Sequence, residues 1–204
     1  MPKEGAHFDL PIALALMAAM EALPSGEVER FTAMGELSLD GSLVAVNGAL
    51  PAAMSAAEHD RALIVPKACG PEAAWVGATR VLAADSLTAV VRHFTGQMPL
   101  DPAEPGEVPE AAFDKDLRDV KGQERAKRAL EIAAAGRHHL LMVGSPGSGK
   151  SMLAARLPSI LPPLEPDEAL ETSMIHSLAG LIDEGGISRA RPFRAPHHTA
   201  SMAA

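Results

Sequence analysis

The residues with the clearest chemical meaning form a glycine-rich octet in the chain of 204 residues, Gly144-Ser145-Pro146-Gly147-Ser148-Gly149-Lys150-Ser151. The octet matches the pattern G-x-x-x-x-G-K-[ST] in full. Its glycines let the backbone bend so that successive N–H groups converge on phosphate oxygens. A helix that follows the octet would point its positive end at the same anion. The pattern therefore predicts a nucleotide site.

Two side chains of the octet are expected to carry most of the chemistry. Lys150 should reach the β- and γ-phosphates as a point charge, and it is the predicted catalytic residue. The Ser151 hydroxyl should complete the coordination of Mg²⁺, which makes it the predicted metal ligand. The alternative is a chance glycine-rich turn, which average residue usage allows in about one chain of this length in a hundred or fewer. The cofactor-binding residues that the pattern predicts are the whole octet and Met152 after it.

The segments around the octet have the elements that such a site needs. Residues 140–143 are four consecutive apolar residues, typical of a central parallel strand. Apolar residues recur at helical spacing over residues 123–135, and a second helix should run from Lys150 to about Leu157. One more helix is expected over residues 166–178, ending near Gly180. The order of helix, strand, loop and helix indicates an α/β unit.

The first half of the chain predicts a separate, small α+β unit. The hairpin signal Asp40-Gly41 separates two expected strands, and Pro66 stops a third. The helices are expected over residues 10–21, 49–58, 71–76 and 86–94, and the strands over residues 31–39, 43–46 and 62–65. Residues 96–112 hold four prolines with acidic residues between them, which predicts an extended linker.

Composition and charge exclude several classes of protein. Residues 1–110 carry a net charge of −9 and residues 111–204 a net charge of +1, so only the second half is suited to face an anion. Five Phe, one Trp and no Tyr leave few rings that could stack on single-stranded nucleic acid. A single cysteine, Cys69, excludes an internal disulfide and a cysteine-rich zinc site, and it suits a reducing cytoplasm.

No apolar run reaches the roughly 18 residues that a membrane span needs, so no membrane contact is expected. Both ends of the sequence suggest a fragment of a longer protein.

Several segments together resemble the magnesium-chelatase-like AAA+ ATPases, and within them the ComM/YifB type. The resemblance covers nearly the whole chain. Its segments are residues 121–123, the octet, residues 157–164 and 191–201 in the second half, and residues 8–14, 35–41 and 48–53 in the first half. In AAA+ ATPases, a segment similar to residues 120–123 lies against the adenine, so the resemblance adds Val120, Gly122 and Gln123 to the predicted cofactor-binding residues. A plain helix start is the alternative for this segment.

The resemblance implies an α/β fold in which a partial P-loop AAA+ domain follows a small α+β domain. The AAA+ part would span residues 113–204, and the linker would span residues 96–112. Residues 1–95 would form an incomplete domain with the fold of the Lon protease domain.

The resemblance also implies a motor that uses ATP and Mg²⁺ and is hexameric when full length. For the ComM type, the implied activity is DNA helicase or branch migration during uptake and recombination of foreign DNA. One alternative is the ATPase subunit of a metal chelatase or protein-remodelling chaperone, which acts on a protein partner. Another is a bare binding module, in which the fragment binds nucleotide without turnover.

The sequence departs from the Lon-type proteases at their catalytic dyad of serine and lysine. The serine position falls on His7, and the lysine should fall near residues 51–53, but no lysine occurs between Lys3 and Lys67. A nucleophile without its activating amine is inert, so the first domain is predicted to be non-proteolytic. His7 itself is expected to be structural.

The acids that ATP hydrolysis requires are also not evident. Asp183 and Glu184 imitate the usual pair, but only two apolar residues precede them, so we expect a solvated turn. By the resemblance, the functional acid pair, the sensor residues and the arginine finger lie beyond Ala204.

A basic cluster near the end of the chain leaves three uses open. Arg189, Arg191 and Arg194 lie near His197 and His198 in the sequence. They could be structural or part of a subunit interface, they could contact DNA phosphate, or they could contribute to a metal site. The histidines are adjacent, so on a strand their rings would point apart, which disfavours the metal site.

Overall fold

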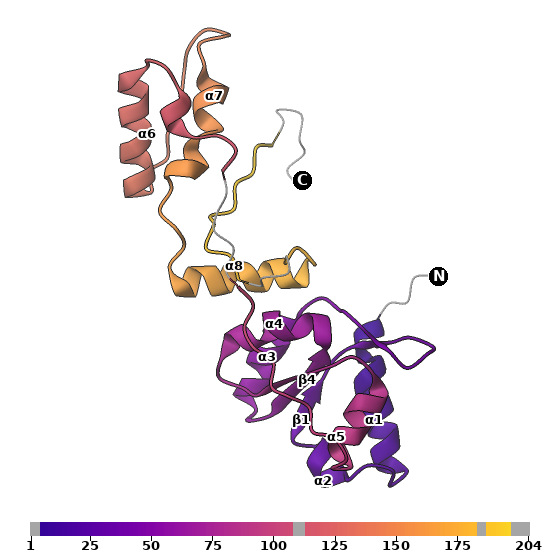
Figure 1. The fold of residues 1–204 in the computed structure, drawn as a ribbon. Helices are drawn as coiled ribbons and strands as arrows, with labels where there is room; N and C mark the ends of the chain where they lie inside the picture. Colours follow the sequence, from indigo (N-terminus) through magenta and orange to yellow (C-terminus); the bar gives the residue numbers. More distant parts are fainter. Residues whose placement is uncertain (1–4, 108–112, 183–186, 197–204) are drawn as a thin grey trace. The chain divides into compact units, whose positions relative to one another are not determined.

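The structure is a computed structural model that describes residues 5–107, 113–182 and 187–196 (Figure 1). The chain divides into two compact units. The first comprises Met1–Pro109 with Asp167–Ser188, and the second comprises Glu110–Pro166 with Arg189–Ala204. Residues 167–182 thus pack with the first unit, although the sequence assigns them to the second domain. The predicted domain boundaries stay a prediction.

A three-stranded parallel sheet forms the centre of the first unit. Its order is β1 (Phe31–Ala33), β4 (Ala62–Pro66), β5 (Val81–Ala84). Side chains along β4 alternate between the two faces, with Leu63 and Val65 in one apolar cluster and Ile64 in the other. All three are fully buried because both faces of the sheet are covered. The predicted mixed α/β class is confirmed, but the parallel sheet lies in the unit for which the sequence predicted an α+β fold.

Helices supply the apolar residues on each face of this sheet (Figure 1). On one face, α1 (Asp9–Ala19) contributes Leu10 and Leu14, and α5 (Leu87–Phe94) contributes Val90. On the other face, α3 (Ala49–Glu58) and α4 (Gly70–Ala73) contribute mainly alanines. The short elements of this unit are η1 (Ala6–Phe8), α2 (Ser25–Val28), η2 (Lys67–Cys69) and η3 (Ala74–Val76).

The predicted strand over residues 31–39 is divided at Gly35. Before it, β1 pairs with β4; after it, β2 (Glu36–Leu37) pairs with β3 (Leu43–Val44) in the antiparallel hairpin expected around Asp40-Gly41. Gly35 leaves the sheet because its N–H donates to His7 O and its carbonyl accepts from Leu10 N–H. The sequence did not predict β5, whose two alanines have low strand propensity; pairing with β4 decides it.

The acidic, proline-rich segment is extended, but much of it lies along the first unit. The Leu100 N–H donates to His93 Nδ1 at 3.0 Å, and Pro102 forms an antiparallel bridge with Leu82 of β5. The Ala103 N–H donates to Val81 O at 2.8 Å. Residues 98–106 therefore cover the edge of β5 that no other strand pairs with in the described part of the chain.

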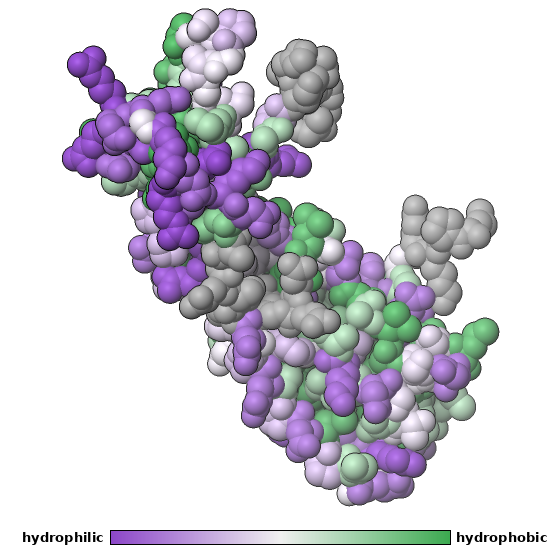
Figure 2. Space-filling view, turned by 45° about the horizontal axis from the view of Figure 1, so that its top comes forward, coloured by the Kyte–Doolittle hydropathy of each residue, from purple (hydrophilic) through white to green (hydrophobic). Residues whose placement is uncertain are grey.

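The second unit is mainly helical. Its elements are η4 (Leu117–Asp119), α6 (Glu124–Gly136), α7 (Lys150–Ala154) and η5 (Leu157–Ile160). Leu117, Val120, Leu130 and Leu153 form its buried cluster. In Figure 2, the surface over α6 is mainly hydrophilic, in agreement with the ion pair between Arg128 and Glu131 on this helix.

The predicted central strand over residues 140–143 is wrong. These residues form no strand, and Leu141 and Val143 are 85% and 87% exposed. A strand needs neighbours to accept and donate its backbone hydrogen bonds, and the described residues of the second unit contain no strand that could pair with this run.

Helix α8 (Pro166–Leu178) has the bounds that the sequence predicted and packs within the first unit. Among the described residues, no helix is both long enough and apolar enough to cross a membrane.

Protonation of His93 should weaken the first unit. Burial, and then the charge of Arg80, lower the pKa of His93 below its ordinary value of 6.5. The unfolded chain then binds this proton more readily, so the stabilisation is present above about pH 6.5 and is lost as the pH falls through the lowered pKa. We expect the free energy of unfolding, measured in urea, to decrease from about pH 7 to about pH 5.

The decrease should be smaller in His93→Gln than in the wild type. It should be as large as in the wild type in His59→Gln, which alters an exposed histidine of the same unit. An equal pH dependence in wild type and His93→Gln would contradict this account.

Candidate nucleotide-binding site

The glycine-rich octet forms a tight bend before α7. Gly147 and Gly149 have φ values of +77° and +86°, a region that residues with a Cβ atom rarely adopt. The Ser148 N–H donates to Ser145 O at 3.3 Å across the bend. The pattern requires glycine at residue 149, where this backbone needs it, whereas Gly147 stands at a position that the pattern leaves open.

The ammonium group of Lys150 closes the bend from within. Lys150 Nζ donates to Gly144 O and Ser145 O, each at 2.8 Å, and to Ser148 Oγ at 3.3 Å. These three acceptors match the three N–H bonds of the ammonium group. The positive charge is held at the loop, and the long contact to Ser148 is the one that a phosphate oxygen could replace most readily.

The upstream segment meets the loop through Gln123. Its Nε2 donates to Ser148 O at 3.5 Å, and the chain turns there because Gly122 and Gln123 have φ values of +69° and +59°. Val120 instead faces the buried cluster, where it packs with Leu153 of α7. The structure thus brings Gln123 to the octet, while the contact of this segment with adenine stays a prediction.

Arg156, which the sequence analysis did not single out, fixes α7 below the loop. Its Nη1 donates to Met152 O at 2.9 Å, and its Nε donates to Asp116 O at 3.1 Å. Ser159 Oγ accepts the Leu117 N–H at 3.3 Å and ties η5 to η4. A lone arginine between apolar residues gives no sequence signal, because its two carbonyl partners are set by the fold.

Ser151 and Met152 both begin α7 and are exposed. The Ser151 hydroxyl is thereby accessible to an ion bound beside the loop. Its role as a metal ligand, like the roles of the other predicted site residues, stays a prediction.

The other candidate residues of the second half are placed only in part. Asp183, Glu184, His197 and His198 lie outside the described residues. The guanidinium groups of Arg189 and Arg191 donate to carbonyl oxygens of residues 162–164, which is a structural role. Among the described residues, no group of three His, Cys, Asp or Glu side chains could hold a metal ion.

The two segments that the resemblance aligned with the protease dyad lie around one cavity of the first unit. This cavity, of about 630 Å³, is lined by His7, Asn47, Pro51 and Ala52 among others. The described lining contains no lysine. Cys69 is not a substitute nucleophile, since burial raises the pKa of its thiol and only 3% of it is exposed.

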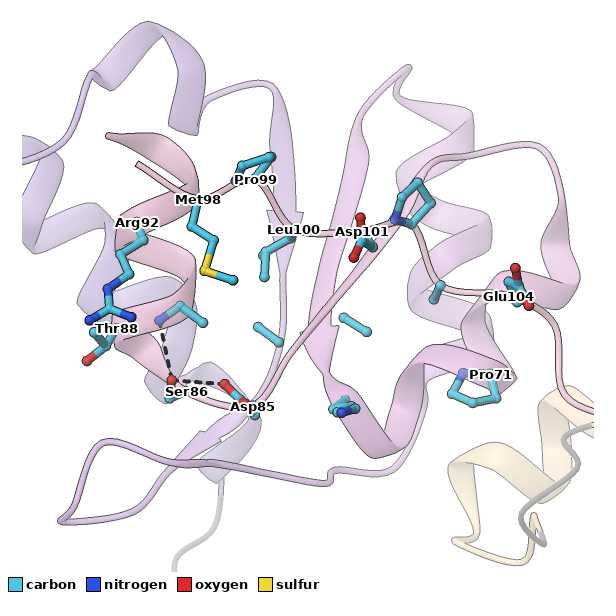
Figure 3. Close-up of a pocket in the computed structure, with 16 residues that line it drawn as sticks. Pro71, Asp85, Ser86, Thr88, Arg92, Met98, Pro99, Leu100, Asp101 and Glu104 are labelled. Carbon is cyan, nitrogen blue, oxygen red and sulfur yellow. Dashed lines mark hydrogen bonds between the residues drawn. The ribbon is translucent and has the colours of Figure 1, made fainter. Parts of the chain in front are cut away.

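A further cavity of about 690 Å³ lies between α5 and residues 98–104 (Figure 3). The Ser86 hydroxyl, which lines this cavity, already has two hydrogen-bond partners. It caps α5 by accepting the Ala89 N–H at 3.3 Å, and it donates to Asp85 Oδ1 at 3.0 Å. These contacts explain the start of α5 rather than a catalytic arrangement.

Comparison with known proteins connects both units to one family. The family described as "Magnesium chelatase, subunit ChlI" matches residues 116–204, and "Subunit ChlI of Mg-chelatase" matches residues 1–69. YifB of Escherichia coli K12 is 44% identical over 204 residues, which are 100% of this chain and 40% of YifB. The chain belongs to the magnesium-chelatase-like family, of the ComM/YifB type.

Two other relatives match this chain, one over its whole length and one over part of it. The competence protein ComM of Haemophilus influenzae is 43% identical over 210 residues, covering 100% of this chain and 41% of ComM. An archaeal Lon protease of Archaeoglobus fulgidus is 36% identical over 80 residues, which are 39% of this chain and 12% of that protease. The chain therefore spans about two fifths of the length of YifB and ComM.

The two left-handed glycines of the octet should differ in their response to substitution. A Cβ at Gly147 would meet no atom within 4 Å, so Gly147→Ala adds only backbone strain, about 1–2 kcal/mol. A Cβ at Gly149 would lie 2.8 Å from Gln123 Nε2. Gly149→Ala should therefore also displace Gln123 from Ser148 and lose about 0.5–1.5 kcal/mol more.

Amide hydrogen exchange of α6 would measure the stability of this unit. In a Gln123→Ala background, the two glycine substitutions should become equal, because the displaced contact is already gone. A difference that persists in that background would contradict the contact between Gly149 and Gln123.

Proposed function

We propose that this chain is the nucleotide-binding part of an AAA+ ATPase of the magnesium-chelatase-like family. The observation that carries the proposal is the closed octet, in which the Lys150 ammonium lies inside a bend built on Gly147 and Gly149. Family membership supports the same conclusion. Residues 113–204 would be the start of the AAA+ domain, and residues 1–95 part of a Lon-like, non-proteolytic domain.

The residues present fit a nucleoside triphosphate with Mg²⁺. Lys150 would bind the β- and γ-phosphates after exchanging its contact with Ser148, and the exposed Ser151 hydroxyl would be available to Mg²⁺. The metal would neutralise charge on the phosphates when it is bound. Gln123 would hold the loop from the other side through Ser148 O.

We further propose that the longer protein couples ATP hydrolysis to DNA remodelling, as a cytoplasmic hexamer. Similarity to the competence protein ComM over the whole chain supports this substrate. The family name alone would equally suit an ATPase subunit of a metal chelatase. Because the N-terminal, Lon-like part precedes the phosphate loop, as in the ComM/YifB relatives, we favour DNA remodelling.

Lys150→Ala should remove most ATP binding. Each hydrogen bond to a charged group contributes about 1.5–3 kcal/mol, so losing one weakens binding by at least about tenfold. Isothermal titration calorimetry with ATP and Mg²⁺ would measure the loss. Lys115→Ala, which removes an exposed lysine of the same unit, is the matched control. Wild-type affinity in Lys150→Ala would overturn the proposed site.

The longer protein should bind branched DNA in a gel-shift assay at low salt, and rising salt should weaken this binding because phosphate contacts release counterions. Absence of any DNA binding by the longer protein at low salt would instead favour a protein substrate.

The 204-residue chain alone should bind nucleotide and show no measurable ATP hydrolysis.

A further inference from the structure

Helix α8 has a narrow buried face made of small side chains. Ala169, Ser173 and Ser177 recur at intervals of four residues and are 1%, 2% and 2% exposed. On the other side of the helix, Ile175 is 68% exposed. The fully buried face of α8 is therefore made of small residues, while Ile175 faces solvent.

Small residues let α8 approach the first unit closely. A Cβ atom at Gly180, just after the helix, would lie 2.7 Å from the side chain of Asn47. A Cβ atom at Gly48 would lie 3.4 Å from Leu178 Cδ2. The end of α8 thus lies directly against the segment that begins α3.

A single carboxylate oxygen joins α8 to α3. Glu72 Oε1 accepts the Ser177 hydroxyl at 2.5 Å and the Leu50 N–H at 3.0 Å. The N-cap of α3 is Gly48, which has no side chain with which to cap the helix. Glu72 supplies the missing cap and uses the same oxygen to hold Ser177.

The chain enters and leaves α8 from the second unit. The Leu164 N–H donates to Arg189 O at 2.9 Å, and Arg189 Nε donates to Leu164 O at 3.2 Å. The chain therefore leaves the second unit after Leu164 and returns to it at Arg189, and these two residues are hydrogen-bonded to each other, while α8 packs within the first unit.

We propose that α8 is a docking arm, and that Asn47, Gly48 and Glu72 form its receptor on the first unit. The arm attaches the chain of the second unit, which contains the glycine-rich octet, to the first unit. This contact does not depend on the connection through residues 108–112. Glu72 is the positioning residue of this contact. The proposal does not require nucleotide binding.

Amide hydrogen exchange of α8 in the 204-residue chain tests the contact. Alanine has a higher helix propensity than serine, so Ser177→Ala would slow exchange in a helix that is not docked. A docked helix that loses its bond to Glu72 should instead exchange about tenfold faster. Glu171→Ala, on the exposed side of α8, should not accelerate exchange.

Variants of Glu72 separate docking from capping. Glu72→Gln keeps an acceptor and should have a smaller effect on α8 than Glu72→Ala. In Glu72→Ala, Ser177→Ala should add little, because the bond is already lost. Unchanged or slower exchange of α8 in Ser177→Ala, or an effect of Glu72→Ala on α3 alone, would overturn the proposal.

A cleaved chain tests the arm itself. With a protease site placed at residues 108–112, the two fragments of the folded wild type should remain together in gel filtration after cleavage. The same cleavage in Ser177→Ala combined with Glu72→Ala should increase the separated fraction. Full separation of the wild-type fragments would overturn the arm as an attachment between the units.

Discussion

The ammonium group of Lys150 shapes the glycine-rich loop by holding two of its carbonyl oxygens at 2.8 Å. These carbonyls belong to the first two residues of the octet, and the lysine is near its end, so the side chain spans the bend that it closes. A cation in this position compensates the carbonyl dipoles. It also places a positive charge beside the left-handed backbone of Gly147 and Gly149. This charge favours the binding of a phosphate chain.

The support below this loop comes from side chains that hold backbone, rather than from a sheet. Arg156 joins α7 to the segment before η4, and Gln123 reaches the loop from the start of α6. Within the described part of this unit, the apolar run at residues 140–143 is unpaired, and Leu140, Leu141 and Val143 are exposed. Its sequence is that of a buried strand, so its burial depends on neighbouring strands that the described residues do not provide.

In the first unit, polar groups perform two structural tasks at once. Glu72 caps α3 and holds Ser177 of α8, and His93 packs against Phe31 while accepting the Leu100 N–H. Both contacts join segments far apart in the sequence to the sheet. The Lon-like unit is thus completed by residues 98–106 and by α8, neither of which belongs to the region that the ChlI match over residues 1–69 covers.

Local sequence signals were sufficient for several features of this protein. The helices at residues 49–58 and 166–178 follow from helix-forming stretches, and the bend of the octet follows from a pattern that requires glycine at residue 149, which has left-handed backbone. Such features depend on residues close together in the chain.

Tertiary structure decided what no local signal contains. β5 became a strand by pairing with β4, and residues 140–143 did not become one because the described part of the second unit offers no strand to pair with them. Glu72 and Arg156 gained their roles from hydrogen bonds to residues distant in sequence or set by the fold. The physical reason is common to all four: a backbone or carboxylate group is stabilised only by the partner that folding brings to it, and the residue types alone do not name that partner.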